Sequence, residues 1–148
     1  MRNKVRLLGL DVGEKRIGVA LSDPLKKTAQ PFGVIERKDL ASVAAQIKEM
    51  IDKFDVEKII VGLPLKMDGT LGTQGQAVKS FADELRTLLM FSVETWDERL
   101  TTKEAHRALR EAGVAAKKRR GLTDKLAAAL ILQSYLDSHA RSRESGEG

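Results

Sequence analysis

The chain has 148 residues, with 26 lysines and arginines against 21 aspartates and glutamates, and its formal charge is +5 at neutral pH. This length fits one domain, the absence of cysteine excludes disulfides and thiolate metal sites, and the basic excess gives a mild bias toward anionic partners. The N-terminal apolar run contains Arg6 and stops at Asp11, which predicts a strand and not a signal peptide. No apolar run reaches the length of a membrane span. We therefore expect a soluble, cytoplasmic protein without a membrane partner.

Two apolar strand patterns lie in residues 5–23, which read VRLLGLDVGEKRIGVALSD. The polar corner between them, opened by Gly13, is too short for a crossover helix, so the two strands must be antiparallel. Asp11 closes the first strand beside this corner, where a carboxylate is held rigidly and still meets solvent. Alternatively, the Asp11 side chain only shapes the turn.

The middle of the chain alternates between strand and helix patterns. In chain order, we predict a strand at 32–37, a helix at 40–54, a strand at 58–62, a helix that ends near Leu89, and a strand at 91–96. Asp39 stands at the N-cap of the first helix, and the continuous apolar run 58–62 is typical of a strand buried on both faces. The Gly-rich stretch 63–75 predicts a long loop, and loops of this length are often functional.

Beyond the last predicted strand, the pattern is helical. The spacing of a capping box predicts a helix over 101–113. A last helix begins at Thr123 or Asp124 and runs to about Ala140. The polar, Gly-containing segment 141–148 is expected to be a disordered tail.

These elements predict an α/β fold in one domain, residues 1–140. Right-handed crossovers place the last two strands parallel to the first. The sheet is then mixed, with a three-stranded antiparallel meander plus two parallel strands, and helices flank it. The carboxyl ends of the parallel strands meet at one edge, where open α/β sheets bind ligands.

Three carboxylates are expected to meet at this edge. Asp11 and Glu98 each stand at or just past the carboxyl end of a predicted parallel strand, and Asp124 shares the helical face that should pack on the sheet. Converging carboxylates suit a hard divalent metal with oxygen ligands. Alternatively, Asp124 only caps its helix and Glu98 only pairs with Arg99 on the surface.

Four blocks resemble, in the same order, the signature blocks of the YqgF/RuvX family of resolvase-like nucleases: DVGEKRIGVALSD, VGLPLKMDGT, DERLTT and KRRGLTDKLAAALIL. The resemblance leaves only the tail uncovered. It implies an RNase H-like fold and a Mg²⁺- or Mn²⁺-dependent endonuclease with a two-metal site, in which Asp11, Glu98 and Asp124 are the catalytic carboxylates and metal ligands. It also implies processing of the 5′ end of the 16S ribosomal RNA precursor in ribosome biogenesis, with Holliday junction resolution in recombination and repair as the alternative.

Basic residues flank all three acids in the sequence, which fits a nucleic-acid partner. The expected phosphate contacts are Lys15, Arg16, Arg99, Lys117, Lys118, Arg119 and Arg120. The run Lys117–Arg120 is alternatively a solvated charge cluster. We favour structured RNA over branched DNA, and a monomer over a dimer, because the predicted helices leave no spare apolar stripe for a dimer interface.

Two other functional classes fit parts of the sequence. An Asp-x-Gly corner between two strands also begins the fold of actin-like and sugar-kinase-like ATPases, but their two lobes need a much longer chain. A catalytically silent RNA-binding module on the same fold would keep the acids for structure. His106 and His139 are expected to be solvated helix residues, and the low aromatic content argues against a base-stacking platform.

Overall fold

The computed structural model describes residues 5–98 and 116–146, and it describes side chains at 5–98 and 124–140. In chain order the elements are β1 (Arg6–Val12), β2 (Arg16–Ser22), β3 (Ala29–Glu36), α1 (Leu40–Phe54), β4 (Val56–Leu63), α2 (Thr73–Leu89), β5 (Val93–Asp97) and α4 (Ala116–Gly146). Among the described helices, none combines the length and the apolar character that a membrane crossing needs.

The strands form one mixed, five-stranded sheet in the order β3-β2-β1-β4-β5. β1 pairs antiparallel with β2, and β2 pairs antiparallel with β3, whereas β4 pairs parallel with both β1 and β5. The predicted meander plus two parallel strands is therefore confirmed. Because β1, β4 and β5 run in the same direction, their carboxyl ends lie at one edge of the sheet.

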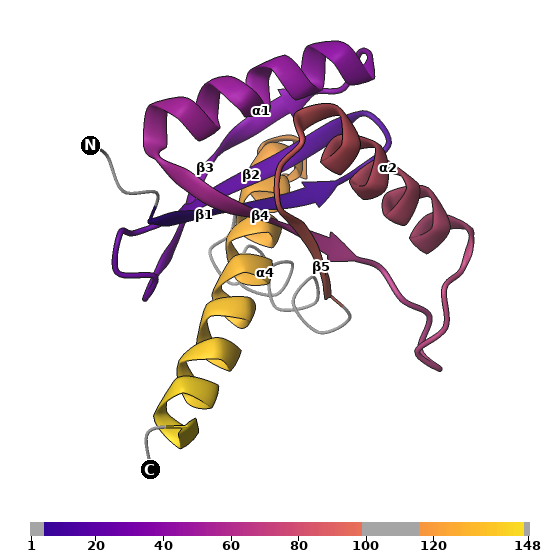
Figure 1. Ribbon diagram of the computed structural model, residues 1–148. Helices are drawn as coiled ribbons and strands as arrows, with labels where there is room; N and C mark the ends of the chain where they lie inside the picture. Colours follow the sequence, from indigo (N-terminus) through magenta and orange to yellow (C-terminus); the bar gives the residue numbers. More distant parts are fainter. Residues whose placement is uncertain (1–4, 99–115, 147–148) are drawn as a thin grey trace.

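Helices cover both faces of the sheet (Figure 1). α1 and α2 pack on one face and α4 packs on the other, and each face has its own apolar core. Ile59 belongs to the first core and Ile60 to the second, because successive side chains of a strand point to opposite faces. The run 58–62 is thus the doubly buried strand that its composition predicted.

Local signals set the ends of α1 and β3. Oδ1 of Asp39 accepts a hydrogen bond of 2.7 Å from the backbone N–H of Ser42, which confirms the predicted N-cap of α1. β3 begins at Ala29, earlier than predicted, so that Pro31 lies inside the strand. A proline is tolerated there because β3 is an edge strand and the register with β2 shifts next to Ala20.

α4 begins earlier and ends later than the sequence predicted. It begins at Ala116 and includes the basic run 117–120, because lysine and arginine are among the strong helix formers. It ends at Gly146 and not near Ala140. α2 also begins early, at Thr73, within the predicted loop.

Two predictions are left open. The predicted helix over 101–113 lies outside the described residues, as does His106. The division of the chain into one domain, 1–140, and a disordered tail, 141–148, stays a prediction.

Glycines in three adjacent strands let α4 lie close to the sheet. A Cβ on Gly18 of β2 would collide with the backbone oxygen of Asp124. A Cβ on Gly9 of β1 would lie 2.9 Å from Cβ of Leu132. A Cβ on Gly62 of β4 would collide with the side chain of Ile131. The sequence therefore fixes how deeply the Asp124 end of α4 sits against β2.

Candidate active site

Two acidic residues stand where parallel strands end. Asp11 is the penultimate residue of β1 and pairs with Gly18 of β2. Glu98 directly follows β5, and its backbone N–H donates a hydrogen bond of 3.3 Å to the carbonyl oxygen of Leu63 at the end of β4. The three parallel strands thus bring both side chains to the same edge.

Asp11 and Glu98 contact each other through a hydrogen bond, which the Glu98 carboxyl donates to the Asp11 carboxylate. Burial and the negative charge of Asp124 raise the pKa of Asp11 to about 6, although this hydrogen bond lowers it. Burial, followed by the charge and the hydrogen bond of Asp11, raises the pKa of Glu98 to about 7. The pair therefore retains a proton at pH values where a solvated carboxyl has lost its own.

The position of Glu98 depends on a glycine of β4. A Cβ on Gly62 would lie 2.5 Å from Oε2 of Glu98. Only a residue without a side chain leaves room for this carboxyl beside Asp11.

Asp124 lies within electrostatic reach of Asp11, but its carboxylate is bound by an arginine. Nε of Arg16 donates a hydrogen bond of 3.0 Å to Oδ2 of Asp124. Arg16 is the first residue of β2, just past the polar corner. The two side chains are 35% and 26% exposed, so solvent screens this ion pair only in part.

The donor set suits a hard divalent cation, because carboxylate oxygens are the ligands that Mg²⁺ and Mn²⁺ prefer. Among the residues that the structure describes, no three His, Cys, Asp or Glu side chains lie close enough together to hold one ion. Asp11 and Glu98 are in contact, whereas Asp124 would have to turn from Arg16 toward Asp11 to join them. The catalytic and metal-binding roles of these residues stay predictions.

The predicted phosphate-binding residues are only partly placed. Lys15 is exposed in the corner after β1, and Arg16 is engaged by Asp124. The backbone of Lys117–Arg120 forms the first turns of α4, ahead of Asp124. Arg99 lies outside the described residues.

Sequence reasoning missed Arg37. Its Nη1 donates a hydrogen bond of 2.8 Å to the carbonyl oxygen of Gly13, and its guanidinium lies 4.9 Å from the centre of the Phe81 ring. Arg37 and Thr73 line a cavity of about 440 Å³ next to the end of β1. The only sequence signal was that Arg37 directly follows the strand β3. A cation after a strand is too common to indicate a functional residue.

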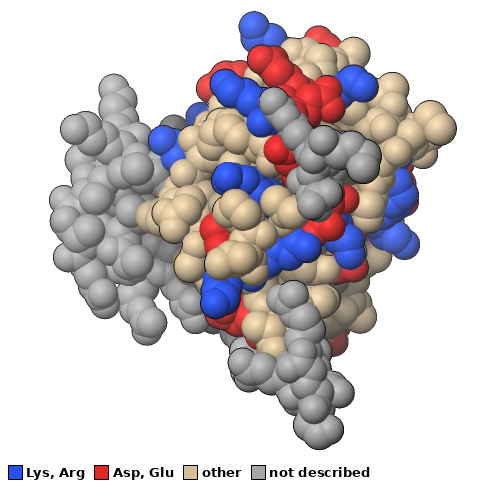
Figure 2. All heavy atoms as spheres, turned by 60° about the vertical axis from the view of Figure 1, so that its left-hand side comes forward, with Lys and Arg blue, Asp and Glu red and all other residues tan. Residues whose placement is uncertain are grey.

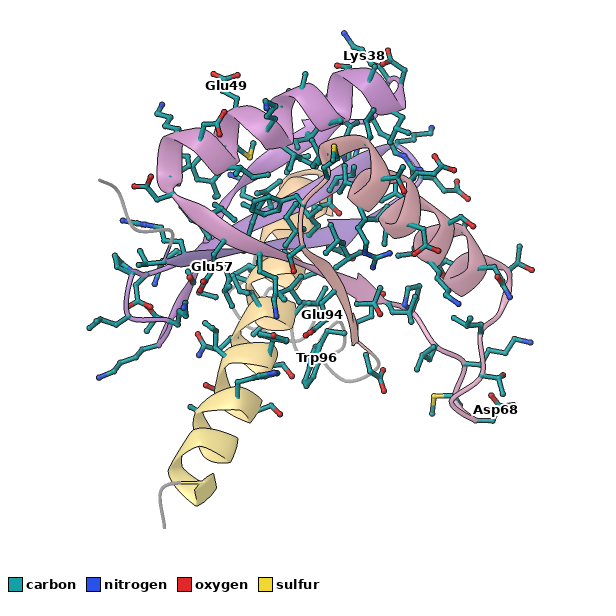
Figure 3. All side chains as sticks on the ribbon, in the orientation of Figure 1. Lys38, Glu49, Glu57, Asp68, Glu94 and Trp96 are labelled. Carbon is teal, nitrogen blue, oxygen red and sulfur yellow. The ribbon has the colours of Figure 1, made fainter. Side chains whose placement is uncertain are left out.

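The predicted loop after β4 contains a small hairpin. Leu65 and Leu71 form an isolated antiparallel bridge, and the side chain of Asp68 accepts hydrogen bonds from the backbone N–H and the hydroxyl of Thr70. Figure 3 shows Asp68 at the tip, away from the body of the protein. The loop is thus an ordered projection that begins at the end of β4.

Comparisons with known proteins give a consistent result. The family model described as "RuvX: Holliday junction resolvase" matches residues 5–138. A protein of Syntrophus aciditrophicus is 50% identical over 139 residues, which cover 94% of this chain and 93% of the relative. A protein of Halothermothrix orenii is 51% identical over 133 residues, which cover 90% and 95%. Both relatives bear the name "Putative pre-16S rRNA nuclease".

Two solved structures share the fold. RuvC of Thermus thermophilus, in complex with a Holliday junction substrate, has a TM-score of 0.52 at 16% identity, covering 86% of this chain and 91% of that chain. The fowlpox virus resolvase, in complex with Holliday junction DNA, has a TM-score of 0.53 at 11% identity, covering 90% and 97%. The RNase H-like fold expected from the sequence is therefore confirmed.

Proposed function

The chain belongs to the RuvX family, and on that premise we propose that it is a divalent-metal-dependent endonuclease that processes the 5′ end of the 16S ribosomal RNA precursor. The family membership makes the chain a nuclease, which is a hydrolase whose substrate is nucleic acid. The contact between Asp11 and Glu98 at the carboxyl edge of the sheet is the observation that carries the proposed site.

Asp11 and Glu98 would hold Mg²⁺ or Mn²⁺, with Asp124 as the third carboxylate. When bound, a pair of such ions supplies charge stabilisation and an activated water for phosphodiester hydrolysis. The raised pKa values support this assignment, because two adjacent carboxyls that are costly to ionise together favour a cation between them. Arg16 would fix Asp124 next to the pair until Asp124 turns toward it.

Cations around the edge would bind the phosphates on either side of the cleaved bond. We assign this role to Lys15, Arg99 and the run Lys117–Arg120, and we add Arg37, whose guanidinium is already oriented by Gly13. Arg16 takes a double role, since its guanidinium has donors besides the Nε that binds Asp124.

We favour structured RNA and a monomer. The curated relatives carry the name of an rRNA precursor nuclease, and both apolar faces of the sheet are already covered by the helices of this chain. A single site suits single cuts in RNA, whose 2′-hydroxyls also distinguish it from DNA. Such a role places the protein in the cytoplasm, where ribosomes are assembled.

The test is a competition between two substrates. Purified protein with Mg²⁺ or Mn²⁺ receives equal amounts of a 16S rRNA precursor and a four-way DNA junction, and sedimentation gives the oligomeric state. We expect cuts near the 5′ end of the mature RNA by a monomer. Paired symmetric nicks in the junction by a stable dimer, with the RNA intact, would instead favour Holliday junction resolution, the activity that the family description names.

The same competition, together with calorimetry, addresses the silent-module alternative. An RNA-binding module without catalysis would bind the precursor but leave it uncut with every divalent metal tried. Asp11 and Glu98 would then have no ion to hold, and calorimetry with Mn²⁺ would give no heat of binding.

A further inference from the structure

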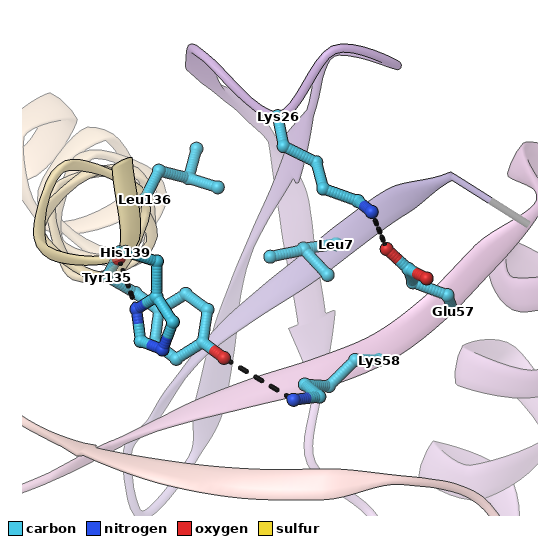
Figure 4. Close-up of a pocket in the computed structure, with 7 residues that line it drawn as sticks. All are labelled: Leu7, Lys26, Glu57, Lys58, Tyr135, Leu136 and His139. Atoms are coloured by element: carbon cyan, nitrogen blue, oxygen red, sulfur yellow. Dashed lines mark hydrogen bonds and ion pairs between the residues drawn. The ribbon is translucent and has the colours of Figure 1, made fainter. Parts of the chain in front are cut away.

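A second cavity, of about 410 Å³, opens at the edge of the sheet opposite to Asp11 and Glu98. Figure 4 shows residues that line it. It lies at the amino ends of β1 and β4, and Leu7 and Leu136 provide its apolar surface. Its volume falls in the range of sites for small ligands. From Leu7 to Asp11 along β1, the separation is roughly 13 Å, so the cavity does not belong to the carboxylate site.

One wall of the cavity is a rigid pair of rings one turn apart on α4. The rings of Tyr135 and His139 are stacked, with centroids 3.9 Å apart and 26° between their planes. Nδ1 of His139 lies 2.9 Å from the carbonyl oxygen of Tyr135, which fixes the imidazole. Trp96 packs edge-on against Tyr135 at 5.3 Å, and its Nε1 donates to Oγ of Ser134. Figure 3 shows Trp96 on β5 beside α4.

The pair of rings corrects one expectation from the sequence. His139 is not a solvated helix residue, because it is partly buried and stacked on Tyr135. The expectation that the low aromatic content argues against a base-stacking platform stays a prediction, although Tyr135 and His139, one helical turn apart, do stack on each other. The aromatic count includes Tyr135 but not histidine, so it could not reveal this pair.

The other wall carries three charged side chains. Lys26 forms an ion pair with Glu57, so its charge is compensated. Nζ of Lys58 lies 3.4 Å from the hydroxyl of Tyr135 and 3.6 Å from Oε1 of Glu94. Both distances exceed those of strong charge-assisted hydrogen bonds, so these two contacts do not saturate the three donors of the ammonium.

We propose that this cavity binds one nucleoside monophosphate unit, either free or within a single strand. The base packs against His139 and Leu136, and the phosphate binds Nζ of Lys58. Each lysine has an acidic partner, but the ion pair of Lys58 with Glu94, at 3.6 Å, is longer than that of Lys26 with Glu57, so Lys58 is the lysine that one phosphate would engage. Figure 2 shows basic and acidic side chains interspersed on the side of the molecule that it brings forward.

The occupant within a strand rests on the proposed nuclease function, whereas the free nucleotide does not. In the strand, the cavity would anchor one unpaired nucleotide of the substrate at a distance from the cut. Stacking on an aromatic ring accepts every base, so the anchor would select for single-stranded character and not for sequence.

The test uses the single tryptophan of the chain, Trp96, whose ring lies 5.9 Å from that of His139. Adenosine monophosphate is titrated against the full chain without metal, with tryptophan fluorescence and calorimetry as readouts. Lys58→Gln should raise the Kd about tenfold or more, because it removes a hydrogen bond to a charged group. His139→Ala should raise it about fivefold or more, because the base no longer stacks on a ring.

Matched variants keep the test independent of folding. His139→Phe retains a ring and should bind close to the native protein, even if His139→Ala unfolds. Lys48→Gln on α1, exposed and on the other face of the sheet, should leave the Kd unchanged. Circular dichroism verifies that each variant is folded.

A second titration, with a short single-stranded oligoadenylate, distinguishes the sources. Tighter binding of the oligomer, abolished in Lys58→Gln, assigns the cavity to a strand, whereas equal binding of the monophosphate assigns it to a free nucleotide. Adenosine that binds as tightly as its monophosphate, or no response to either phosphorylated ligand, would overturn the proposal. Asp11→Asn should retain this binding, because Asp11 lies at the other edge of the sheet. If the native protein binds the nucleotide but does not cleave RNA, the proposed nuclease function fails and the cavity proposal stands.

Discussion

Arg16 and Asp124, which are 108 positions apart in the sequence, are joined by a hydrogen bond of 3.0 Å from Nε to Oδ2. This bond ties the polar corner after β1 to the third turn of α4. It also means that the cation expected to bind only phosphate already holds an acid of the site. The role of Arg16 is therefore testable through Asp124.

We predict that Arg16→Lys lowers kcat about 10- to 100-fold with little change in KM, since lysine keeps the charge but lacks the planar donor that orients Asp124. The loss of stability should stay below about 1 kcal/mol because the pair is partly exposed. Single-turnover cleavage and urea unfolding measure the two effects. Lys15→Gln, at the exposed neighbour, should instead raise KM, and an equal effect of both variants would refute the distinction.

Asp11→Asn should abolish cleavage and leave folding and nucleic-acid binding largely intact. The amide keeps the shape of the side chain and loses the charge that would hold a metal, which should cost several orders of magnitude in rate. Gel-based cleavage, together with binding in the absence of metal, provides the measurement. Near-native turnover of this variant would rule out Asp11 as a metal ligand.

The metal-free protein should lose stability as the pH rises from about 4 to about 7. The pKa values of Asp11 and Glu98 are raised to about 6 and about 7, so the folded state binds more protons than the unfolded state in this window. Glu98→Gln should flatten the decline, and Glu49→Gln on the exposed face of α1 should not. Urea unfolding in a chelator at several pH values gives the slopes, which must differ between the two variants.

Gly18→Ala should destabilise the protein by about 1–3 kcal/mol and lower activity, because the new methyl group meets the backbone of Asp124 and pushes α4 away. Gly33→Ala is the control, since a Cβ there meets nothing within 4 Å. Its stability should change by no more than about 0.5 kcal/mol. Similar unfolding midpoints for the two variants would mean that α4 tolerates the shift.

Replacing Lys117, Lys118, Arg119 and Arg120 with glutamine should weaken binding to every sequence alike. The slope of log Kd against log salt should fall by about one unit for each phosphate that the variant no longer neutralises. A variant with glutamine at the exposed Lys38, Lys48, Lys53 and Lys79 removes the same four charges and controls for net charge. An unchanged slope would mean that Lys117–Arg120 is a solvated charge cluster that contacts no phosphate.

The sheet could be predicted because each strand carried a local signal. The corner after Asp11 forced a hairpin, and the apolar run 58–62 required burial on both faces, so order and direction followed from connection lengths. The ends of α4 could not be predicted, because charged residues that favour helix look like a linker when only apolar periodicity is followed.

The contact between Asp11 and Glu98 followed from topology, but the binding of Asp124 by Arg16 did not. The carboxyl ends of parallel strands lie at the same edge of a sheet, so Asp11 and Glu98 had to be neighbours. The position of a side chain on α4 depends instead on how closely this helix packs on the sheet. That distance is set here by Gly18, whose effect is visible only once α4 lies against β2. The stacking of Tyr135 and His139 was missed because helical spacing alone does not show whether two rings lie parallel, and Trp96 of β5, which packs against both, is remote in sequence.

The order of elements along the chain also governs what the ribosome releases during synthesis. All five strands, with α1 and α2, are synthesised before α4. The sheet face that carries Leu7 and Ile60 therefore lacks its α4 contacts until this helix has been made. Asp124 arrives with that helix. A nascent or truncated chain therefore holds only two of the three acids, and it exposes apolar surface of the kind that chaperones bind.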